Sequence, residues 1–153
     1  MLGVFSLGGR LLGVDPVAVY VHIPFCPSKC GYCDFNSYAM EGEIVGRTVR
    51  ALVAEMERSP HRGREAKTLY FGGGTPTYLE PASFEQIFRA VTDAHPLTPH
   101  CEITVEANPG TMDASRYRCL RDLGVHRLSL GAQSFDDEDL VLLGRVHRSS
   151  EIE

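Results

Sequence analysis

Apolar positions along this chain follow two spacings, one typical of buried strands and one typical of helices. Short apolar runs rich in β-branched residues occur at residues 18–23, 68–71, 102–106 and 127–131. Runs of this length and composition indicate strands. Between and after them, apolar residues recur every three or four positions, which indicates amphipathic helices. The pattern therefore predicts an alternation of strand and helix from one end of the chain to the other.

The first two predicted helices have the clearest apolar stripes. Pro81 suits the first turn of the second helix, where the missing N–H costs no hydrogen bond. The residues expected to face the core are Val45, Val49, Leu52, Val53 and Met56 in the first helix and Phe84, Ile87, Phe88 and Val91 in the second.

The third and fourth predicted helices are shorter. The third begins near Asp113, directs Tyr117 and Leu120 inward and ends at Gly124, a residue that commonly terminates helices. The fourth spans residues 136–143, and its acidic first turn complements the helix dipole.

Glycine-containing segments between the predicted elements indicate where the strands end. The second strand is expected to stop at the glycines of residues 72–74, and the third at residues 108–110. Strands that alternate with helices pair in parallel, and ligands bind at the carboxyl ends of such strands. One site is therefore expected to be assembled from several strand ends.

The predicted fold class is α/β, with parallel strand–helix units. Four strands cannot close a barrel, so either the sheet stays open or these residues are the front part of a longer protein. Residues 145–153 look like the start of another helix, so we expect the chain to be the N-terminal part of a longer protein. We expect a disordered leader or start-site extension at residues 1–16, followed by one core domain at residues 17–153.

Composition and charge exclude several classes of function. The net charge is −5 with both signs interspersed, unlike the basic stripe of a nucleic-acid binder. No apolar run approaches the ~18 residues of a membrane span. Residues 1–14 lack the basic start and cleavage site of a signal peptide. We expect a cytoplasmic protein.

Three of the five cysteines, Cys26, Cys30 and Cys33, lie within eight positions in a C-x3-C-x2-C arrangement. An odd number of crowded cysteines does not fit a secreted disulfide framework. Iron–sulfur clusters are held by cysteine thiolates, normally four for a [4Fe–4S] cubane, so three would leave one iron open to a small molecule. Cys101 and Cys119 lie far downstream and are expected to act as small apolar residues.

Two other interpretations of the cysteines remain. A zinc site needs a fourth ligand, and His22 lies nearby but within a predicted strand. A redox C-x2-C pair formed by Cys30 and Cys33 leaves Cys26 without a role. The cluster accounts for all three thiols, which favours it.

The motifs around these cysteines resemble the radical S-adenosylmethionine (SAM) superfamily and, within it, the oxygen-independent coproporphyrinogen III oxidase-like group. The matching segments lie at residues 20–26, 30–37, 71–76, 106–109 and 130–135, in the same order as in the group. The resemblance extends over about residues 17–147. It implies a partial (βα)6 TIM-like barrel with about four strands present.

The resemblance also implies the cofactors. In this superfamily the open iron of a [4Fe–4S] cluster binds the amino and carboxylate groups of SAM, and an electron from the cluster splits the sulfonium. Cys26, Cys30 and Cys33 are the implied cluster ligands. The residues that match SAM-binding positions are Tyr20, Tyr32, Gly73, Gly74, Thr75, Glu106, Gln133 and Arg145. The last two, with Gly74 and Thr75, match positions for a second SAM molecule.

Some of these residues also have simpler explanations. Glycines let the backbone approach a ligand closely, but Gly72–Gly74 could also be a tight turn between a strand and a helix. Glu106 could form a structural ion pair, Tyr32 could be a plain loop aromatic residue, and Tyr20 taken alone suggests a core position.

Phe35 divides the possible functions. Porphyrinogen oxidases of the group have a fourth cysteine at this position, whereas residues 33–37 are similar to HemW-type proteins, regarded as heme chaperones. The first hypothesis is therefore a heme-binding and transfer protein with an unknown heme acceptor and electron donor. Its heme-binding motif lies beyond the last residue here. The second is a radical enzyme that oxidises a porphyrinogen, and the third is an inactive α/β fragment. Whether the chain is an enzyme stays open.

Overall fold

The computed structural model describes residues 6–7, 10–11 and 15–152. The leader predicted at residues 1–16 lies largely outside the described residues. Within it, β1 (Ser6–Leu7) and β2 (Arg10–Leu11) pair in antiparallel fashion. The boundary between leader and core domain therefore stays a prediction.

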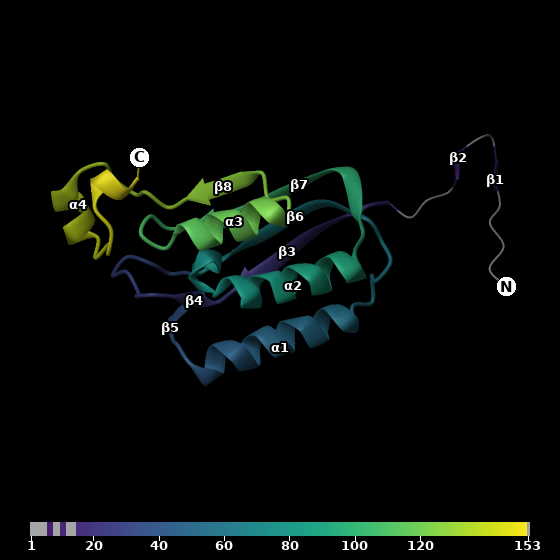
Figure 1. Ribbon diagram of the computed structural model, residues 1–153, viewed down its shortest axis with the longest axis horizontal. Helices are drawn as coiled ribbons and strands as arrows, with labels where there is room; N and C mark the ends of the chain where they lie inside the picture. The colour runs from purple at the N-terminus through teal and green to yellow at the C-terminus, as the bar shows by residue number, and fades with distance from the viewer. Residues whose placement is uncertain (1–5, 8–9, 12–14, 153) are drawn as a thin grey trace.

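A four-stranded parallel sheet forms the centre of the molecule (Figure 1). Its strands are β3 (Val17–Ile23), β6 (Ala66–Gly73), β7 (Leu97–Ala107) and β8 (Arg127–Leu130), and they lie side by side in the order of the chain. Each neighbouring pair is parallel. The predicted α/β class with four parallel strands is confirmed.

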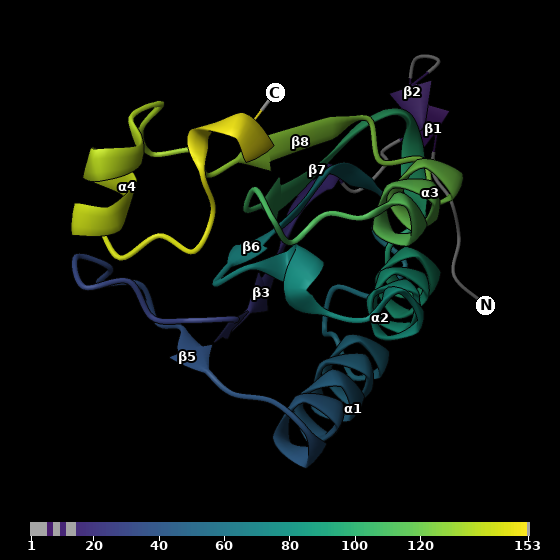
Figure 2. The ribbon, with the colours of Figure 1, turned by 60° about the vertical axis from the view of Figure 1, so that its left-hand side comes forward.

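Three helices cover one face of this sheet, as Figure 2 shows. They are α1 (Glu43–Glu57), α2 (Pro81–Ala94) and α3 (Ala114–Asp122), which follow β3, β6 and β7 in turn. A doubly wound sheet carries helices on both faces, whereas a barrel wall carries them only on its outer face. Sequential strand order with helices on one face is therefore the arrangement of a partial TIM-like barrel.

The short elements lie at the carboxyl ends of the strands. β4 (Phe25–Cys26) and β5 (Tyr38–Ala39) pair at the base of the cysteine loop, residues 26–37, which carries Cys26, Cys30 and Cys33. The 3-10 helix η1 (Pro76–Tyr78) follows β6. Beyond β8 come α4 (Asp137–Leu142) and a second 3-10 helix, η2 (Ser149–Glu151). Figure 2 shows α4 and the cysteine loop at the same end of the sheet.

The core lies between the sheet and the three helices because strand residues alternate between the two faces. Val21, Phe71 and Val105 are buried on the helical side. The ring of Phe71 lies 4.8 Å from that of Phe84 and 5.9 Å from that of Phe88, measured between ring centroids. The apolar stripe predicted for α2 is confirmed, since all four of its residues are buried.

The second strand ends within residues 72–74, as expected, but it includes Gly72 and Gly73, because β3 pairs with both glycines through His22 and Ile23. One prediction about the elements is wrong. Tyr117 was expected to face inward but is exposed. Its ring lines a shallow surface pocket beside the free edge of β8, while Leu120 alone buries the inner face of α3.

In the described part of the chain, none of the helices has the length and apolar character needed to cross a membrane.

Candidate functional site

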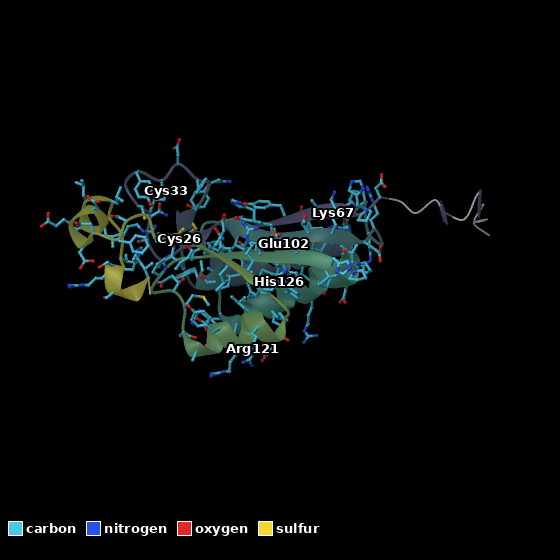
Figure 3. All side chains as sticks on the ribbon, turned by 90° about the horizontal axis from the view of Figure 1, so that it is seen from above. Cys26, Cys33, Lys67, Glu102, Arg121 and His126 are labelled. Carbon is cyan, nitrogen blue, oxygen red and sulfur yellow. The ribbon has the colours of Figure 1, made fainter. Side chains whose placement is uncertain are left out.

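A pocket of about 490 Å³ lies at the carboxyl ends of the parallel strands, between the cysteine loop and the segment around α4. Small-molecule pockets typically measure roughly 300–1,000 Å³. Figure 3 shows Cys26 and Cys33 at this end of the sheet, with Lys67 toward the opposite end. The pocket is lined by residues from β6, β7 and β8 as well as from the loop.

Backbone hydrogen bonds fix the start of the cysteine loop against the end of β6. The amide of Gly74 donates to the carbonyl of Ile23 at 2.8 Å, and the amide of Thr75 donates to the carbonyl of Phe25 at 2.7 Å. The amide of Tyr38 donates to Pro24 at 2.8 Å and closes the base of the loop. Cys26 therefore leaves the sheet from a fixed position.

The three loop cysteines are free thiols, and each has a different donor within reach of its sulfur. The Thr75 hydroxyl lies 3.5 Å from Cys26 Sγ, Arg145 Nη1 lies 3.5 Å from Cys30 Sγ, and Lys29 Nζ lies 3.8 Å from Cys33 Sγ. Donors of this kind stabilise thiolates, which are the form that binds metal.

Within residues 15–152, no three His, Cys, Asp or Glu side chains are gathered around the position of a single metal ion. In a cubane each thiolate binds a different iron, so its ligands do not converge on one point. Three half-buried thiols on one loop, facing one pocket, suit a cluster of several irons.

Gly73 and Gly74 bring the backbone of β6 against the loop. A Cβ at position 74 would lie 2.5 Å from the Phe25 carbonyl oxygen and 3.0 Å from Cys26 Sγ. Gly73 has φ of 117°, a conformation that residues with a side chain rarely adopt. Both positions therefore require glycine for the loop to sit where it does.

Glu106 is a carboxylate at the end of β7 with one hydrogen bond to each oxygen. The Tyr70 hydroxyl donates to Oε1 at 2.7 Å, and the Gly73 amide donates to Oε2 at 3.0 Å. No Lys, Arg or His within residues 15–152 forms a salt bridge with it. The ion pair considered from the sequence is not formed, and the carboxylate presents its remaining lone pairs to the pocket.

The charge of Glu106 also acts on two tyrosines. The hydrogen bond from Tyr70 to Glu106 raises the pKa of that phenol, because ionisation would place two negative charges side by side. Burial raises the pKa of Tyr20, and the charge of Glu106 adds to the effect. Both phenols therefore stay neutral donors at physiological pH.

Arg145 reaches the pocket from the segment that follows α4. Its Nη2 donates to Asn108 Oδ1 and to the Gly131 carbonyl, both at 2.8 Å, while Nη1 lies 3.5 Å from the Tyr32 hydroxyl. Its Nε is buried and has no partner in the described part of the chain. The pocket thus has a carboxylate on one wall and a guanidinium on another.

Comparison with known proteins identifies the family to which this pocket with its three cysteines belongs. The family model of the radical SAM superfamily matches residues 20–153. This chain belongs to the radical SAM superfamily. Membership implies a [4Fe–4S] cluster and SAM as cofactors, in agreement with the resemblance found in the sequence motifs.

Relatives of this radical SAM chain include proteins named as heme chaperones. The heme chaperone HemW of Escherichia coli is 41% identical over 92% of this chain and 38% of its own length. HemW of Synechocystis is 40% identical over 90% of the chain and 35% of its own length. The chain spans less than two fifths of these relatives.

A solved structure shares the fold. The coproporphyrinogen III oxidase HemN of Escherichia coli, described as a radical SAM enzyme, superposes with a TM-score of 0.80 at 30% identity. The match covers 90% of this chain and 32% of HemN. The sequential strand order, the helices on one face of the sheet (Figure 2) and this superposition all indicate that the chain forms part of a radical SAM barrel.

The structure brings most of the predicted site residues of this radical SAM chain together. The pocket lining includes Cys26, Cys30, Cys33, Tyr32, Gly73, Gly74, Glu106, Gln133 and Arg145. Thr75 does not line it but lies directly behind Cys26, only 1% exposed. Gln133 has φ of 68°, so its backbone adopts a left-handed conformation that is uncommon outside glycine.

Tyr20 lies apart from the pocket lining. It is 57% exposed, so the core position suggested by its sequence context is wrong. Its ring stacks on Tyr70 with centroids 6.0 Å apart, and its hydroxyl lies 3.0 Å from His22 Nδ1. A contact between Tyr20 and SAM stays a prediction.

Sequence reasoning missed two residues of the site. Lys29 donates to the carbonyl of Phe35 at 2.7 Å and to the hydroxyl of Ser37 at 3.1 Å, and so ties the loop across its width. Asn108 lies between Thr75 and Arg145 and bonds to both. A cation within the cysteine motif and a polar residue directly after a strand were the signals available.

The other two cysteines lie elsewhere. Cys101 is in β7 and Cys119 in α3, both partly buried, and burial raises the pKa of each thiol. Neither lines the pocket. Their position agrees with a packing role.

Proposed function

We propose that this chain binds a [4Fe–4S] cluster through Cys26, Cys30 and Cys33 and binds SAM in the adjoining pocket. The observation that carries the proposal is the convergence on one pocket of the three thiols and six of the eight residues that match SAM-binding positions. These residues come from separate strand ends and loops. Their meeting is a property of the fold and not of any one motif.

The charges of the pocket support SAM as the ligand. SAM carries an ammonium and a sulfonium, both cationic, together with a carboxylate. Glu106 offers acceptors to a cation, and Arg145 offers donors to an anion. When bound and reduced, the cluster supplies the electron that cleaves the sulfonium. The residues of this chain bind the ligand, orient it and exclude water.

The cluster proposal is tested by anaerobic reconstitution with iron and sulfide. We expect about four irons per chain in the wild type and a large loss in Cys33→Ala. Cys119→Ala is the matched control, because this cysteine lies in α3 away from the pocket, and we expect it to keep the full iron content. Full iron in Cys33→Ala would contradict the three-cysteine site.

SAM binding is tested on the same preparations. Addition of SAM to the reduced, reconstituted chain should change the electron paramagnetic resonance spectrum, because the ligand binds the iron that has no cysteine. Adenosine, which lacks the amino acid part, is the control and should leave the spectrum unchanged. A spectrum insensitive to SAM would contradict the proposed pocket.

For the protein as a whole we propose a HemW-type role, binding heme and passing it to an acceptor protein. The HemW relatives, 40–41% identical to this chain, support it. Phe35 supports it as well, because a cysteine stands at this position in porphyrinogen oxidases of the group. Its side chain is 71% exposed at the rim of the pocket.

A chimera tests this role, with the present chain replacing the matching part of Escherichia coli HemW. The heme-binding motif of the chimera comes from HemW, so the test asks whether this chain can serve as the radical SAM part of a heme-binding protein. We expect the chimera to assemble the cluster and to retain heme after gel filtration. A chimera with a full cluster but no heme would contradict the HemW-type role, because the cluster shows that the protein has folded.

The alternative is oxidation of a porphyrinogen, and the structural match to HemN favours it. It is tested by incubating the reconstituted chimera with coproporphyrinogen, SAM and a reductant. We expect no protoporphyrinogen. Its formation would replace the chaperone proposal by the enzymatic one. HemN itself is the positive control.

A further inference from the structure

Asn108 joins the two walls of the pocket. It follows β7 directly, and its side chain lies between Thr75 and Arg145. Its Nδ2 donates to Thr75 Oγ1 at 2.8 Å, and its Oδ1 accepts from Arg145 Nη2 at 2.8 Å. Thr75 Oγ1 and Arg145 Nη1 in turn each lie 3.5 Å from a cysteine sulfur, that of Cys26 and that of Cys30 respectively.

Hydrogen-bond chemistry fixes the direction of this chain of contacts. A guanidinium has donors only, so the amide oxygen of Asn108 must face Arg145. The amide nitrogen must then face Thr75, whose hydroxyl oxygen accepts. The hydroxyl proton of Thr75 is therefore left to donate to Cys26 Sγ, 3.5 Å away. The side chain of Asn108 thus orients two hydrogen-bond donors, one directed at the sulfur of Cys26 and one at the sulfur of Cys30.

The surroundings hold Asn108 in this position. Its backbone carbonyl accepts from the hydroxyl of Thr111 at 2.7 Å and from the Thr111 amide at 3.1 Å, in a tight turn. A Cβ at position 131 would lie 2.6 Å from Asn108 Oδ1, so only glycine at 131 leaves room for the amide. The Gly131 carbonyl shares Arg145 Nη2 with Asn108.

The guanidinium of Arg145 places a positive charge beside the sulfur of Cys30, and this charge is not paired with a carboxylate in the described part of the chain. Of the salt bridges among residues 15–152, none includes Arg145. A positive charge and hydrogen bonds at the sulfurs stabilise the reduced cluster, which carries one more electron, and so raise its reduction potential.

We propose that Asn108 is a positioning residue that sets the reduction potential of the cluster, by holding the Thr75 hydroxyl against Cys26 and the Arg145 guanidinium against Cys30. The inference rests on the proposed function, since it requires the cluster at these cysteines. It assigns the amide of Asn108 a role in electron supply, exerted through Thr75 and Arg145.

The test is a redox titration of the reconstituted chain in the absence of SAM, followed by electron paramagnetic resonance. In Asn108→Ala both donors lose their anchor. We expect the ratio of reduced to oxidised cluster at a fixed solution potential to fall about tenfold, which is 59 mV for one electron. Iron per chain should stay at the wild-type level.

Asn108→Asp is the second variant, because it keeps the shape of the side chain. Its carboxylate accepts from both Arg145 and Thr75, which turns the Thr75 proton away from Cys26 and adds a negative charge. The potential should fall here too. Asn36→Ala is the matched control: this asparagine lies in the cysteine loop, its side chain accepts from Tyr38, and we expect no shift.

The outcomes separate this inference from the proposed function. If the wild type takes up no cluster, the proposed function fails. If the wild type and both variants at position 108 hold full clusters with equal potentials, the cluster proposal stands and the role of Asn108 is overturned. A purely structural role would lower cluster content without moving the potential of the clusters that remain, and this result would also overturn it.

Discussion

The backbone amide of Gly73 donates a hydrogen bond of 3.0 Å to Oε2 of Glu106, 33 residues further along the chain. The bond connects the end of β6 to the end of β7 and aims the carboxylate at the pocket. Because the carbonyl oxygen of a glutamine can also accept from this amide, the charge of Glu106 and its position can be tested separately.

Glu106→Gln should weaken SAM binding about 10- to 100-fold, because a hydrogen bond to a charged group contributes about 1.5–3 kcal/mol. Isothermal titration of the reconstituted chain with SAM gives the dissociation constant. Glu102→Gln is the matched control on the same strand, since Glu102 pairs with Arg127 at the surface. An unchanged SAM affinity in Glu106→Gln at full iron content would remove this carboxylate from the binding site.

Gly74→Ala should lower iron incorporation strongly, because its Cβ would meet the Phe25 backbone at 2.5 Å and push the cysteine loop away. Iron and sulfide per chain after reconstitution measure the effect. Gly31→Ala is the control from within the cysteine motif, where an added Cβ has no neighbour within 4 Å. Equal iron content in the two variants would show that the loop tolerates displacement.

Acid should destabilise the chain partly through Asp113, which caps α3. Its carboxylate accepts from the Ser115 hydroxyl at 2.6 Å and from the amides of Arg116 and Ser115 at 2.9 Å and 2.8 Å. These bonds, that of the hydroxyl first, lower the pKa of Asp113 in the folded state. A lowered pKa gives stability that is present above the unfolded value of about 3.9 and is lost as pH falls below it.

The measurement is the urea midpoint of unfolding at pH 6 and at pH 3. Wild type should lose more stability between these values than Asp113→Asn, which keeps a cap but cannot titrate. Asp93→Asn, an exposed site in the last turn of α2, should lose as much as wild type. An equal loss in all three proteins would show that the cap does not contribute to acid sensitivity.

The free edge of β8 should make this chain prone to self-association. β8 ends the sheet, and Leu128 and Leu130 on it are 39% and 40% exposed. An edge strand offers unpaired backbone groups to another chain, and a charged residue discourages that pairing. Leu128→Lys should therefore reduce light scattering at a given concentration, while the urea midpoint changes little. Scattering equal to that of wild type would place the association elsewhere.

The elements of the fold could be predicted because their signals are local. The short apolar runs that contain Val21, Phe71 and Val105 and the apolar stripe of α2 are both visible in the sequence, because these residues pack into one core. The end of β6 could not be read this way. Gly72 and Gly73 have a weak intrinsic preference for strands, and only their pairing with β3 places them in one.

Site residues could be predicted where the residue type is unusual for its position in the sequence. They could not be predicted where their role depends on hydrogen-bond partners that are distant in the chain. Three close cysteines and a carboxylate at a strand end are visible in the sequence. Asn108 is informative only once Thr75 and Arg145 are seen on either side of it. Tyr20 shows the converse, since a motif match alone did not place it at the pocket.

Arg145 and Cys30 are 115 residues apart in the chain, yet they meet in the site. A ribosome adding about 5–20 residues per second needs on the order of ten seconds to make that stretch. During this time the three thiols have emerged without the guanidinium that later covers Cys30. Iron delivered to the nascent chain would encounter the cysteine loop before the segment with Arg145, which lines the same pocket, has been synthesised. Cluster insertion is therefore expected to follow synthesis, and the cell must keep these thiols reduced until then.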